Sequence, residues 1–111
     1  MTIREFAAAL GAEICQDEFD DAELVGAYTS DLLSDVMANA KEGGALITIQ
    51  AHKNTVAVAT LVNITLIVIC NSRPIPDDMI AAAKDEGIAI ILTKENQYRV
   101  SGKLFAMIEK G

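Results

Sequence analysis

The chain has 111 residues, of which 51% are hydrophobic and 23% are charged, and its formal net charge at pH 7 is −7. A chain this short predicts a single domain over residues 1–111, because it cannot fill two hydrophobic cores of useful size. The negative charge, with no run of basic residues, argues against a general nucleic-acid-binding surface. No stretch approaches the roughly 18 apolar residues needed to cross a bilayer, so we expect a cytoplasmic protein with no membrane contact.

Apolar residues exceed what a domain of this size readily buries, since the mean hydropathy is +0.30. Exposed apolar surface favours self-association, and we therefore expect a homodimer. Cys15 and Cys70 lie in or beside apolar segments, and no Cys-x-x-Cys pair or Cys/His cluster accompanies them. We interpret both as buried, reduced thiols.

The first predicted element is a short helix. Thr2 followed by Glu5 has the spacing of a capping box, and Gly11 is a typical helix terminator. Residues 12–15 then form a predicted strand, and residues 24–28 form a second. The acidic stretch between them lacks the alternating oxygen ligands and the central glycine of a calcium-binding loop, so we interpret it as a solvated connection.

The middle of the chain alternates between predicted helices and strands. Residues 29–42 place their apolar side chains on one helical face, and residues 45–50 form a predicted strand. Residues 54–62 contain many branched side chains that favour a strand, but Asn54 is a good N-cap and a parallel sheet needs a crossover helix here, which favours a helix. Residues 65–70 are apolar after Thr65, as in a strand covered on both faces.

The same alternation continues toward the C-terminus. Pro76, Asp77 and Asp78 favour a helix start, because proline is tolerated in the first turn and carboxylates complement the helix dipole. Gly87 ends this helix, and residues 88–92 form the last predicted strand.

A C-terminal helix follows, with Thr93 as its expected cap. It is predicted to bury Tyr98, Leu104, Phe105 and Ile108. The alternation of strands and helices, with links too long for hairpins, predicts the α/β class: a mainly parallel sheet of about four to five strands with helices on its faces.

Ligands of open parallel sheets bind beyond the carboxyl ends of the strands, where helix N-termini supply amide donors. Three basic residues, Lys53, Arg73 and Lys94, fall in the loops expected there. In a chain of net charge −7 they indicate a pocket for a phosphate or carboxylate, although surface loops ordinarily carry such residues too. The loops are Tyr28–Asp31, Gln50–Asn54, Asn71–Arg73 and Thr93–Asn96.

The only histidine, His52, lies in the second of these loops. A hydrogen-bonding role at the helix start is favoured over general-base catalysis, because no orienting partner is evident. Asn54 is fully explained as the N-cap. Asp31 and Asp35 lie opposite the apolar face of the predicted helix, which favours solvated carboxylates over an acid/base pair, and Asp31 in the first turn is also explained by the helix dipole.

A phosphate-binding P-loop is not present. Gly102 and Lys103 match the end of its pattern, but Gln97 replaces the first glycine and Leu104 replaces the hydroxyl residue.

Four stretches together resemble the DRTGG domain, a small α/β module similar to the N-terminal domain of bacterial HPr kinase/phosphorylase. They are "SDLLSDV", "TIQAHKNTVAVA", "RPIPDDMI" and "GIAIILT". The resemblance runs from about Leu24 to Phe105. It implies an HPr kinase N-terminal-domain-like fold and a dimeric regulatory domain, of the kind found fused to phosphotransacetylases or to pyrophosphatases with CBS domains, or standing alone as we expect here. "QAHKN" stands in place of the name-giving motif.

The first functional hypothesis is a non-enzymatic regulatory or sensor module that dimerises and binds a small anionic ligand, such as an adenine nucleotide or another phosphate. Lys53 and Arg73 would contact the anion. The alternative is a pure interaction module for a partner enzyme. Least favoured is an enzyme, either one using His52 or an HPr-kinase-like serine kinase. The predicted ligand-binding residues are Ser30, Asp31, His52, Lys53, Asn54, Arg73 and Thr93, and no catalytic residue or metal ligand is predicted.

Overall fold

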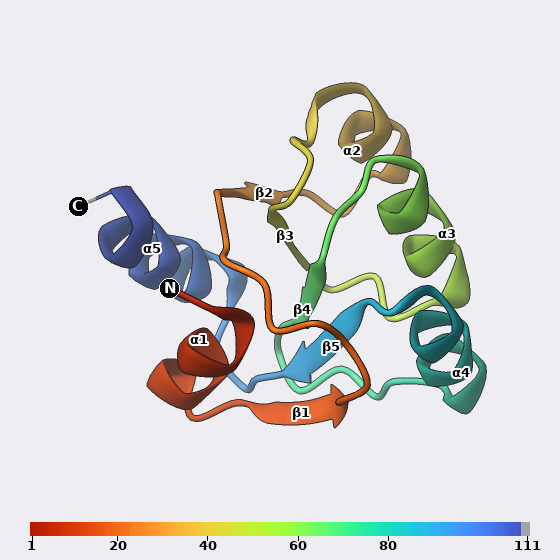
Figure 1. Ribbon diagram of the computed structural model, residues 1–111, viewed down its shortest axis with the longest axis horizontal. Helices are drawn as coiled ribbons and strands as arrows, with labels where there is room; N and C mark the ends of the chain where they lie inside the picture. Colours follow the sequence, from red (N-terminus) through yellow and green to blue (C-terminus); the bar gives the residue numbers. More distant parts are fainter. Residues whose placement is uncertain (110–111) are drawn as a thin grey trace.

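The computed structural model describes residues 1–109, which form one five-stranded sheet flanked by helices. The strands are β1 (Glu13–Gln16), β2 (Ala27–Thr29), β3 (Ala45–Thr48), β4 (Leu66–Ile69) and β5 (Ala89–Leu92). Their order across the sheet is β1-β5-β4-β3-β2, with the last four parallel and β1 antiparallel to β5 (Figure 1). The predicted α/β class with a mainly parallel sheet is confirmed.

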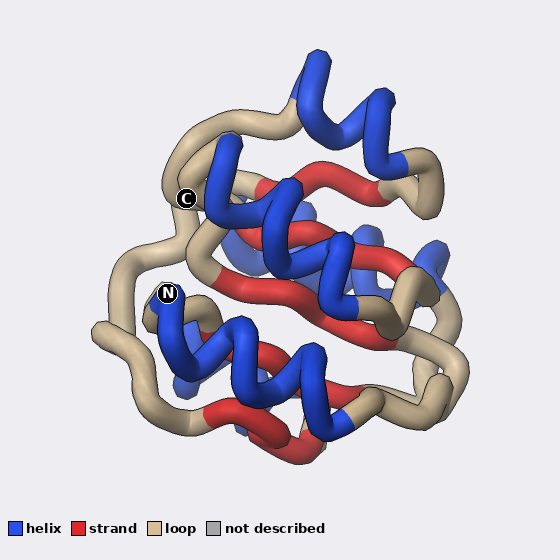
Figure 2. Tube along the Cα trace, turned by 90° about the vertical axis from the view of Figure 1, so that its right-hand side faces the viewer, coloured by secondary structure: helices blue, strands red, loops and turns tan. Residues whose placement is uncertain are grey.

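The helices divide between the two faces of the sheet. They are α1 (Ile3–Leu10), α2 (Leu33–Asn39), α3 (Lys53–Leu61), α4 (Asp77–Glu86) and α5 (Gln97–Glu109). From β2 to β5 each crossover moves one strand in the same direction, so right-handed connections place α2, α3 and α4 on one face (Figure 2). The face opposite carries α1 and α5. Within residues 1–109 no helix is long and apolar enough to cross a membrane.

The core consists of two layers because helices cover both faces of the sheet. Every residue of β3 and β4 is buried, as the continuous apolar runs predict. Side chains alternate between the layers: Ile47 and Val68 pack toward α1 and α5, whereas Leu46 and Ile67 pack toward α2, α3 and α4.

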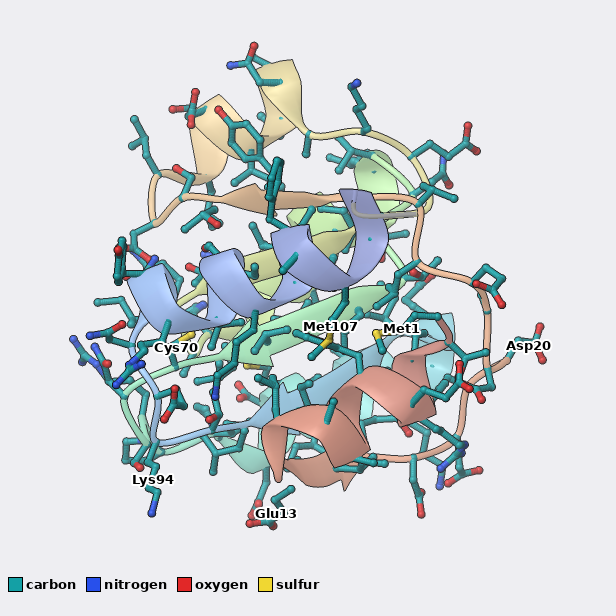
Figure 3. All side chains as sticks on the ribbon, turned by 90° about the vertical axis from the view of Figure 1, so that its left-hand side faces the viewer. Met1, Glu13, Asp20, Cys70, Lys94 and Met107 are labelled. Atoms are coloured by element: carbon teal, nitrogen blue, oxygen red, sulfur yellow. The ribbon has the colours of Figure 1, made fainter. Side chains whose placement is uncertain are left out.

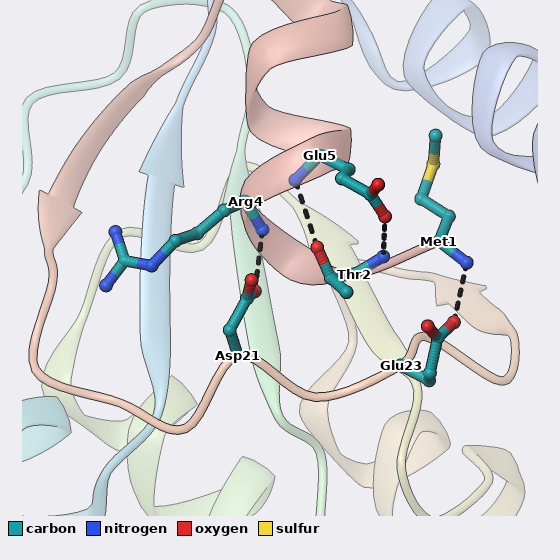
Figure 4. Close-up of polar contacts among 6 residues, drawn as sticks. All are labelled: Met1, Thr2, Arg4, Glu5, Asp21 and Glu23. Carbon is teal, nitrogen blue, oxygen red and sulfur yellow. Dashed lines mark hydrogen bonds and ion pairs between the residues drawn. The ribbon is translucent and has the colours of Figure 1, made fainter.

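The predicted capping box at the start of α1 is confirmed. The Thr2 hydroxyl accepts from the Glu5 amide at 3.2 Å, and the Glu5 carboxylate accepts from the Thr2 amide at 2.8 Å (Figure 4). The amino group of Met1 pairs with Glu23 at 2.6 Å, and the Arg4 amide donates to Asp21. These contacts attach α1 to the acidic connection that follows β1.

Several predicted elements are shorter in the structure, and two of them differ most. The second strand covers Ala27–Thr29 instead of residues 24–28, and α2 covers Leu33–Asn39 instead of residues 29–42. The prediction that Asp31 lies in the first turn of this helix is therefore wrong. Thr29 extends the strand, and the Asp31 carboxylate is engaged with β3, so the helix begins later.

The predicted burial along α5 is only partly correct. Leu104 is buried and Ile108 is half-buried, but the exposed fractions of Tyr98 and Phe105 are 86% and 69%. The buried stripe passes instead through Val100, because only one narrow side of α5 contacts the sheet.

Two predicted helix starts also differ in detail. The cap of α5 is Asn96, whose side-chain oxygen accepts from the Arg99 amide at 2.9 Å, and Thr93 lies too far upstream. Pro76 occupies the N-cap position of α4 instead of its first turn, and Gly87 ends that helix in a left-handed conformation as predicted.

Both cysteines are free thiols, but only Cys70 is fully buried, whereas Cys15 is half-buried. Burial raises the pKa of each thiol from 9.0 to about 11. Between pH 9.0 and about pH 11, the unfolded chain loses thiol protons that the folded chain keeps. The two thiols therefore make the folded chain less stable as the pH rises from 9.0 to about 11.

We expect the same pKa shift to slow the alkylation of Cys15. At about pH 8 its reaction with iodoacetamide should be about tenfold slower in the folded chain than in urea, because the loss of thiolate exceeds the gain in nucleophilicity. Cys70 should react only on unfolding. Mass spectrometry of quenched samples measures both rates, and equal Cys15 rates with and without urea would contradict the expectation.

Candidate functional site

The four loops predicted to carry the site do meet at the carboxyl ends of the parallel strands. The loop after β4 is joined to the loop after β5 by two backbone hydrogen bonds, from Asn71 to Glu95 and from Ser72 to Thr93, each at 3.0 Å. The loop after β2 is joined to the loop after β3 through Asp31 and Gln50. The four loops are therefore joined in two pairs, after β2 and β3 and after β4 and β5, at the same edge of the sheet.

Asp31 is the centre of this arrangement. One of its carboxylate oxygens accepts hydrogen bonds from the Thr48 hydroxyl at 2.9 Å, the Ile49 amide at 2.9 Å and the Gln97 side chain at 3.1 Å. Its backbone carbonyl accepts from Gln50 at 3.0 Å. The interpretation of Asp31 as a solvated surface carboxylate is therefore wrong, because it connects β2, β3 and α5.

Asp35 has a separate role and does not pair with Asp31. Its carboxylate accepts from the Tyr28 hydroxyl at 2.8 Å and from the Asn39 side chain at 2.9 Å. The Tyr28 hydrogen bond lowers the pKa of Asp35, and the same bond raises the pKa of Tyr28. These contacts hold α2 against the edge strand β2.

The start of α3 is capped by His52, and the prediction that Asn54 is the N-cap is wrong. The Nδ1 atom of His52 accepts from the Asn54 amide at 3.0 Å, so Nε2 carries the proton of the neutral ring. The Thr55 hydroxyl donates to the Gln50 carbonyl at 2.7 Å and closes the turn. His52 thus has the hydrogen-bonding role at the helix start that was favoured over catalysis.

Three basic side chains stand free at this edge. Lys53, Arg73 and Lys94 are exposed, and no ion pair joins any of them to a carboxylate of residues 1–108, whose side chains the structure describes. Figure 3 shows Lys94 projecting outward from the molecule, with α1 and α5 on the face toward the viewer. The Lys53 amide, at the first position of α3, also donates to no protein acceptor in the described part of the chain.

Other predicted ligand contacts are engaged in holding the loops. The Ser30 hydroxyl accepts from the Leu32 amide at 3.1 Å, and the Thr93 hydroxyl accepts from the Glu95 amide at 3.1 Å. Asn71 and Ser72 have φ values of 60° and 52°, and both their amides donate to the neighbouring loop. The backbone of this turn therefore has no spare amide at these two positions for an anion.

Sequence reasoning missed the partners of Asp31. Thr48 is fully buried at the end of an apolar strand, and a hydroxyl residue in such a run was a usable signal. Gln97 offered no signal, because it lies 66 residues away from Asp31 along the chain. The ion pair between Lys103 and Glu95, at 3.3 Å, was likewise not evident.

Two hollows of similar size border these loops, each lined by residues of one loop only. A groove of about 540 Å³ runs along β2 and α5, and a second of about 560 Å³ lies between α3 and α4. Lys53 and Asn54 line the second groove together with Asp85 and Glu86. Among the side chains of residues 1–108, no three His, Cys, Asp or Glu residues come together as metal ligands.

Comparisons with known proteins bear on the fold. No family model and no curated protein matches this sequence. A crystal structure of the CBS and DRTGG domains of the regulatory region of Clostridium perfringens pyrophosphatase, complexed with the activator diadenosine tetraphosphate, superimposes with a TM-score of 0.72. The chain has a DRTGG-like α/β fold. Sequence identity is 15%, and the match covers 91% of this chain but only 44% of the other.

Proposed function

We propose that this chain is a non-enzymatic regulatory module, a homodimer that binds an adenine nucleotide or a related phosphate at the carboxyl edge of its sheet. The observation that carries the proposal is the set of three exposed cations, Lys53, Arg73 and Lys94, which have no carboxylate partner among the side chains of residues 1–108 in a chain of net charge −7. The pyrophosphatase regulatory region of similar fold, which binds an adenine nucleotide activator, supports the choice of ligand.

The chemistry of this edge suits a phosphate. Free lysine and arginine side chains form charge-assisted hydrogen bonds with phosphate oxygens, and arginine does so in a bidentate manner. The unbonded Lys53 amide at the start of α3 adds a donor at the positive end of a helix dipole. In this proposal His52 positions that helix start, and Asp31 holds the loops in place.

We expect nucleotide to raise the melting temperature of the wild-type chain. At a ligand concentration 100 times the Kd, binding adds about 2.7 kcal/mol, which is about 10 °C for a domain of this size. The double variant Lys53→Ala/Arg73→Ala should melt at the wild-type temperature without ligand and lose most of the shift. Differential scanning fluorimetry with AMP, ADP, ATP and diadenosine tetraphosphate measures this.

The matched control removes the same charge elsewhere. Lys41 and Lys84 are exposed and lie near the opposite ends of the strands. Because Lys84 pairs with Glu18 at 3.1 Å, Lys41→Ala/Lys84→Ala can lower the melting temperature without ligand, but it should keep the full nucleotide shift. Equal losses in both double variants would indicate a general charge effect. If no nucleotide shifts the wild type, the ligand part of the proposal is wrong.

A pure interaction module is the second candidate, and the exposed apolar side chains favour it. Val25, Leu61, Tyr98 and Phe105 each have an exposed fraction above 60% in a small domain. This candidate predicts self-association with no nucleotide shift for any member of the panel. An enzyme using His52 has less support, because its Nδ1 atom is already engaged by the Asn54 amide.

A further inference from the structure

The two edges of the sheet differ in how they are protected. At the β1 edge the register shifts between Ile14 and Gln16, and the strand begins with the exposed Glu13. A bulge and charged side chains of this kind discourage pairing with another strand. The β2 edge has neither a bulge nor charged side chains, and residues 24–30 also contain no proline.

The backbone of β2 presents free hydrogen-bonding groups on its outer side. The Gly26 carbonyl accepts from Ala45, and the Ser30 amide donates to Ile47, so residues 26, 28 and 30 face β3. In a parallel ladder the residues between them face away. The N–H and C=O groups of Ala27 and Thr29 therefore point outward, and both residues are exposed.

An apolar groove follows the same edge. Its volume is about 540 Å³, and Val25, Leu104, Phe105 and Ile108 are among its lining residues. Phe105 and Val25 have exposed fractions of 69% and 63%. Figure 3 shows β2 as the outermost strand at the top of the view, with α2 above it and α5 below it. The edge strand and the apolar side chains thus form one continuous surface.

The charge distribution favours a second copy as the occupant. Two chains of net charge −7 repel each other over most of their surface, but the β2 segment is uncharged, and among residues 1–108 the only charged residue lining the groove is Lys41. Pairing at this edge therefore brings no carboxylates of the groove together. An interface of standard size takes about 800 Å² per partner, which is a modest share of the 5855 Å² of accessible surface.

We propose that two copies of this chain pair antiparallel through β2, forming one ten-stranded sheet across a two-fold axis. This deepens the homodimer part of the proposed function by assigning its surface. With Tyr28 opposite Tyr28 of the second copy, Ala27 lies opposite Thr29, and their outward groups form four hydrogen bonds. The two α5 helices then lie on the same face, and Phe105 of each copy fills the gap above the paired strands.

The test is the mass of the chain in solution. Size-exclusion chromatography with light scattering at micromolar concentration should give twice 11.8 kDa for the wild type and 11.8 kDa for Ala27→Pro and Phe105→Glu. Proline removes the outward amide of residue 27 without removing a bond to β3. Leu61→Glu is the matched control, because this apolar residue is 71% exposed on α3, outside the surface, and its variant should remain a dimer.

A cross-link tests the register. Tyr28→Cys in a Cys15→Ser background should form a disulfide-linked dimer on mild oxidation, because residues opposite each other in a non-hydrogen-bonded pair have Cα atoms about 4.5 Å apart. Circular dichroism establishes that each variant is folded. A monomeric wild type overturns the proposal, and so does a folded Ala27→Pro or Phe105→Glu variant that remains a dimer.

The nucleotide proposal can be tested independently of the proposed β2 dimer. If the monomeric Ala27→Pro variant keeps the nucleotide-induced rise in melting temperature, ligand binding does not need the β2 interface. If the wild type is a dimer but no nucleotide raises its melting temperature, the nucleotide proposal is wrong and the β2 interface is not contradicted.

Discussion

Asp31→Ala is expected to lower the free energy of unfolding by about 3 to 4 kcal/mol, because hydrogen bonds to a charged acceptor contribute about 1.5 to 3 kcal/mol each and partly share their effects. The substitution leaves the buried Thr48 hydroxyl and the Ile49 amide without an acceptor. It also releases Gln97 at the start of α5. Equilibrium urea unfolding, followed by circular dichroism, measures the change.

Two variants separate the role of Asp31 from a general effect of charge. Asp31→Asn keeps a side-chain carbonyl oxygen, so it should cost about 1 kcal/mol. Asp35→Ala removes a half-buried carboxylate that accepts from Tyr28 and Asn39, and it should cost less than Asp31→Ala. A loss below about 1 kcal/mol for Asp31→Ala would mean that water replaces its contacts, contrary to this interpretation.

Gly44→Ala is expected to destabilise the chain by about 2 to 4 kcal/mol, the sum of overpacking and a weakened backbone hydrogen bond. A Cβ atom at Gly44 would lie 2.9 Å from the Gly26 carbonyl oxygen, which is backbone and cannot rotate away. That oxygen accepts from the Ala45 amide at 3.0 Å, the first bond between β2 and β3. The methyl group therefore pushes β2 away from the sheet.

The matched control is Gly26→Ala, at the residue that directly precedes β2. A Cβ atom there meets nothing within 4 Å, and the φ angle of Gly26 is not positive. Its stability should stay within about 0.5 kcal/mol of the wild type. Urea unfolding of the two variants measures the difference, and similar losses in both would show that the close approach of Gly44 to β2 does not govern the pairing.

Local patterns were sufficient to predict most elements. The capping box of α1, the glycine that ends α4 and the apolar runs of β3 and β4 are signals contained within a few residues, and each is confirmed. The ambiguous segment at 54–62 is the helix α3, as the need for a crossover between parallel strands predicted.

The sequence-based predictions failed where a local pattern fits more than one tertiary arrangement. Phe105 fits a helical apolar pattern, but α5 is an outer helix that buries only Val100 and Leu104 fully, so the pattern overestimated its buried face. At the start of α3, Asn54 has the better intrinsic capping propensity, yet His52 occupies the cap because the turn after β3 places its Nδ1 atom toward the Asn54 amide.

The sequence by itself determined the α/β class, the order of the elements and the four loops at the carboxyl edge, because these follow from local periodicity and from the rule that parallel strands need crossovers. Only the tertiary structure decided that Asp31 joins the loops and that the uncharged segment β2 is an edge strand of the sheet. The hydrogen bonds of Asp31 span 17, 18 and 66 residues along the chain. No local pattern encodes such partners, since they meet only when the sheet has formed.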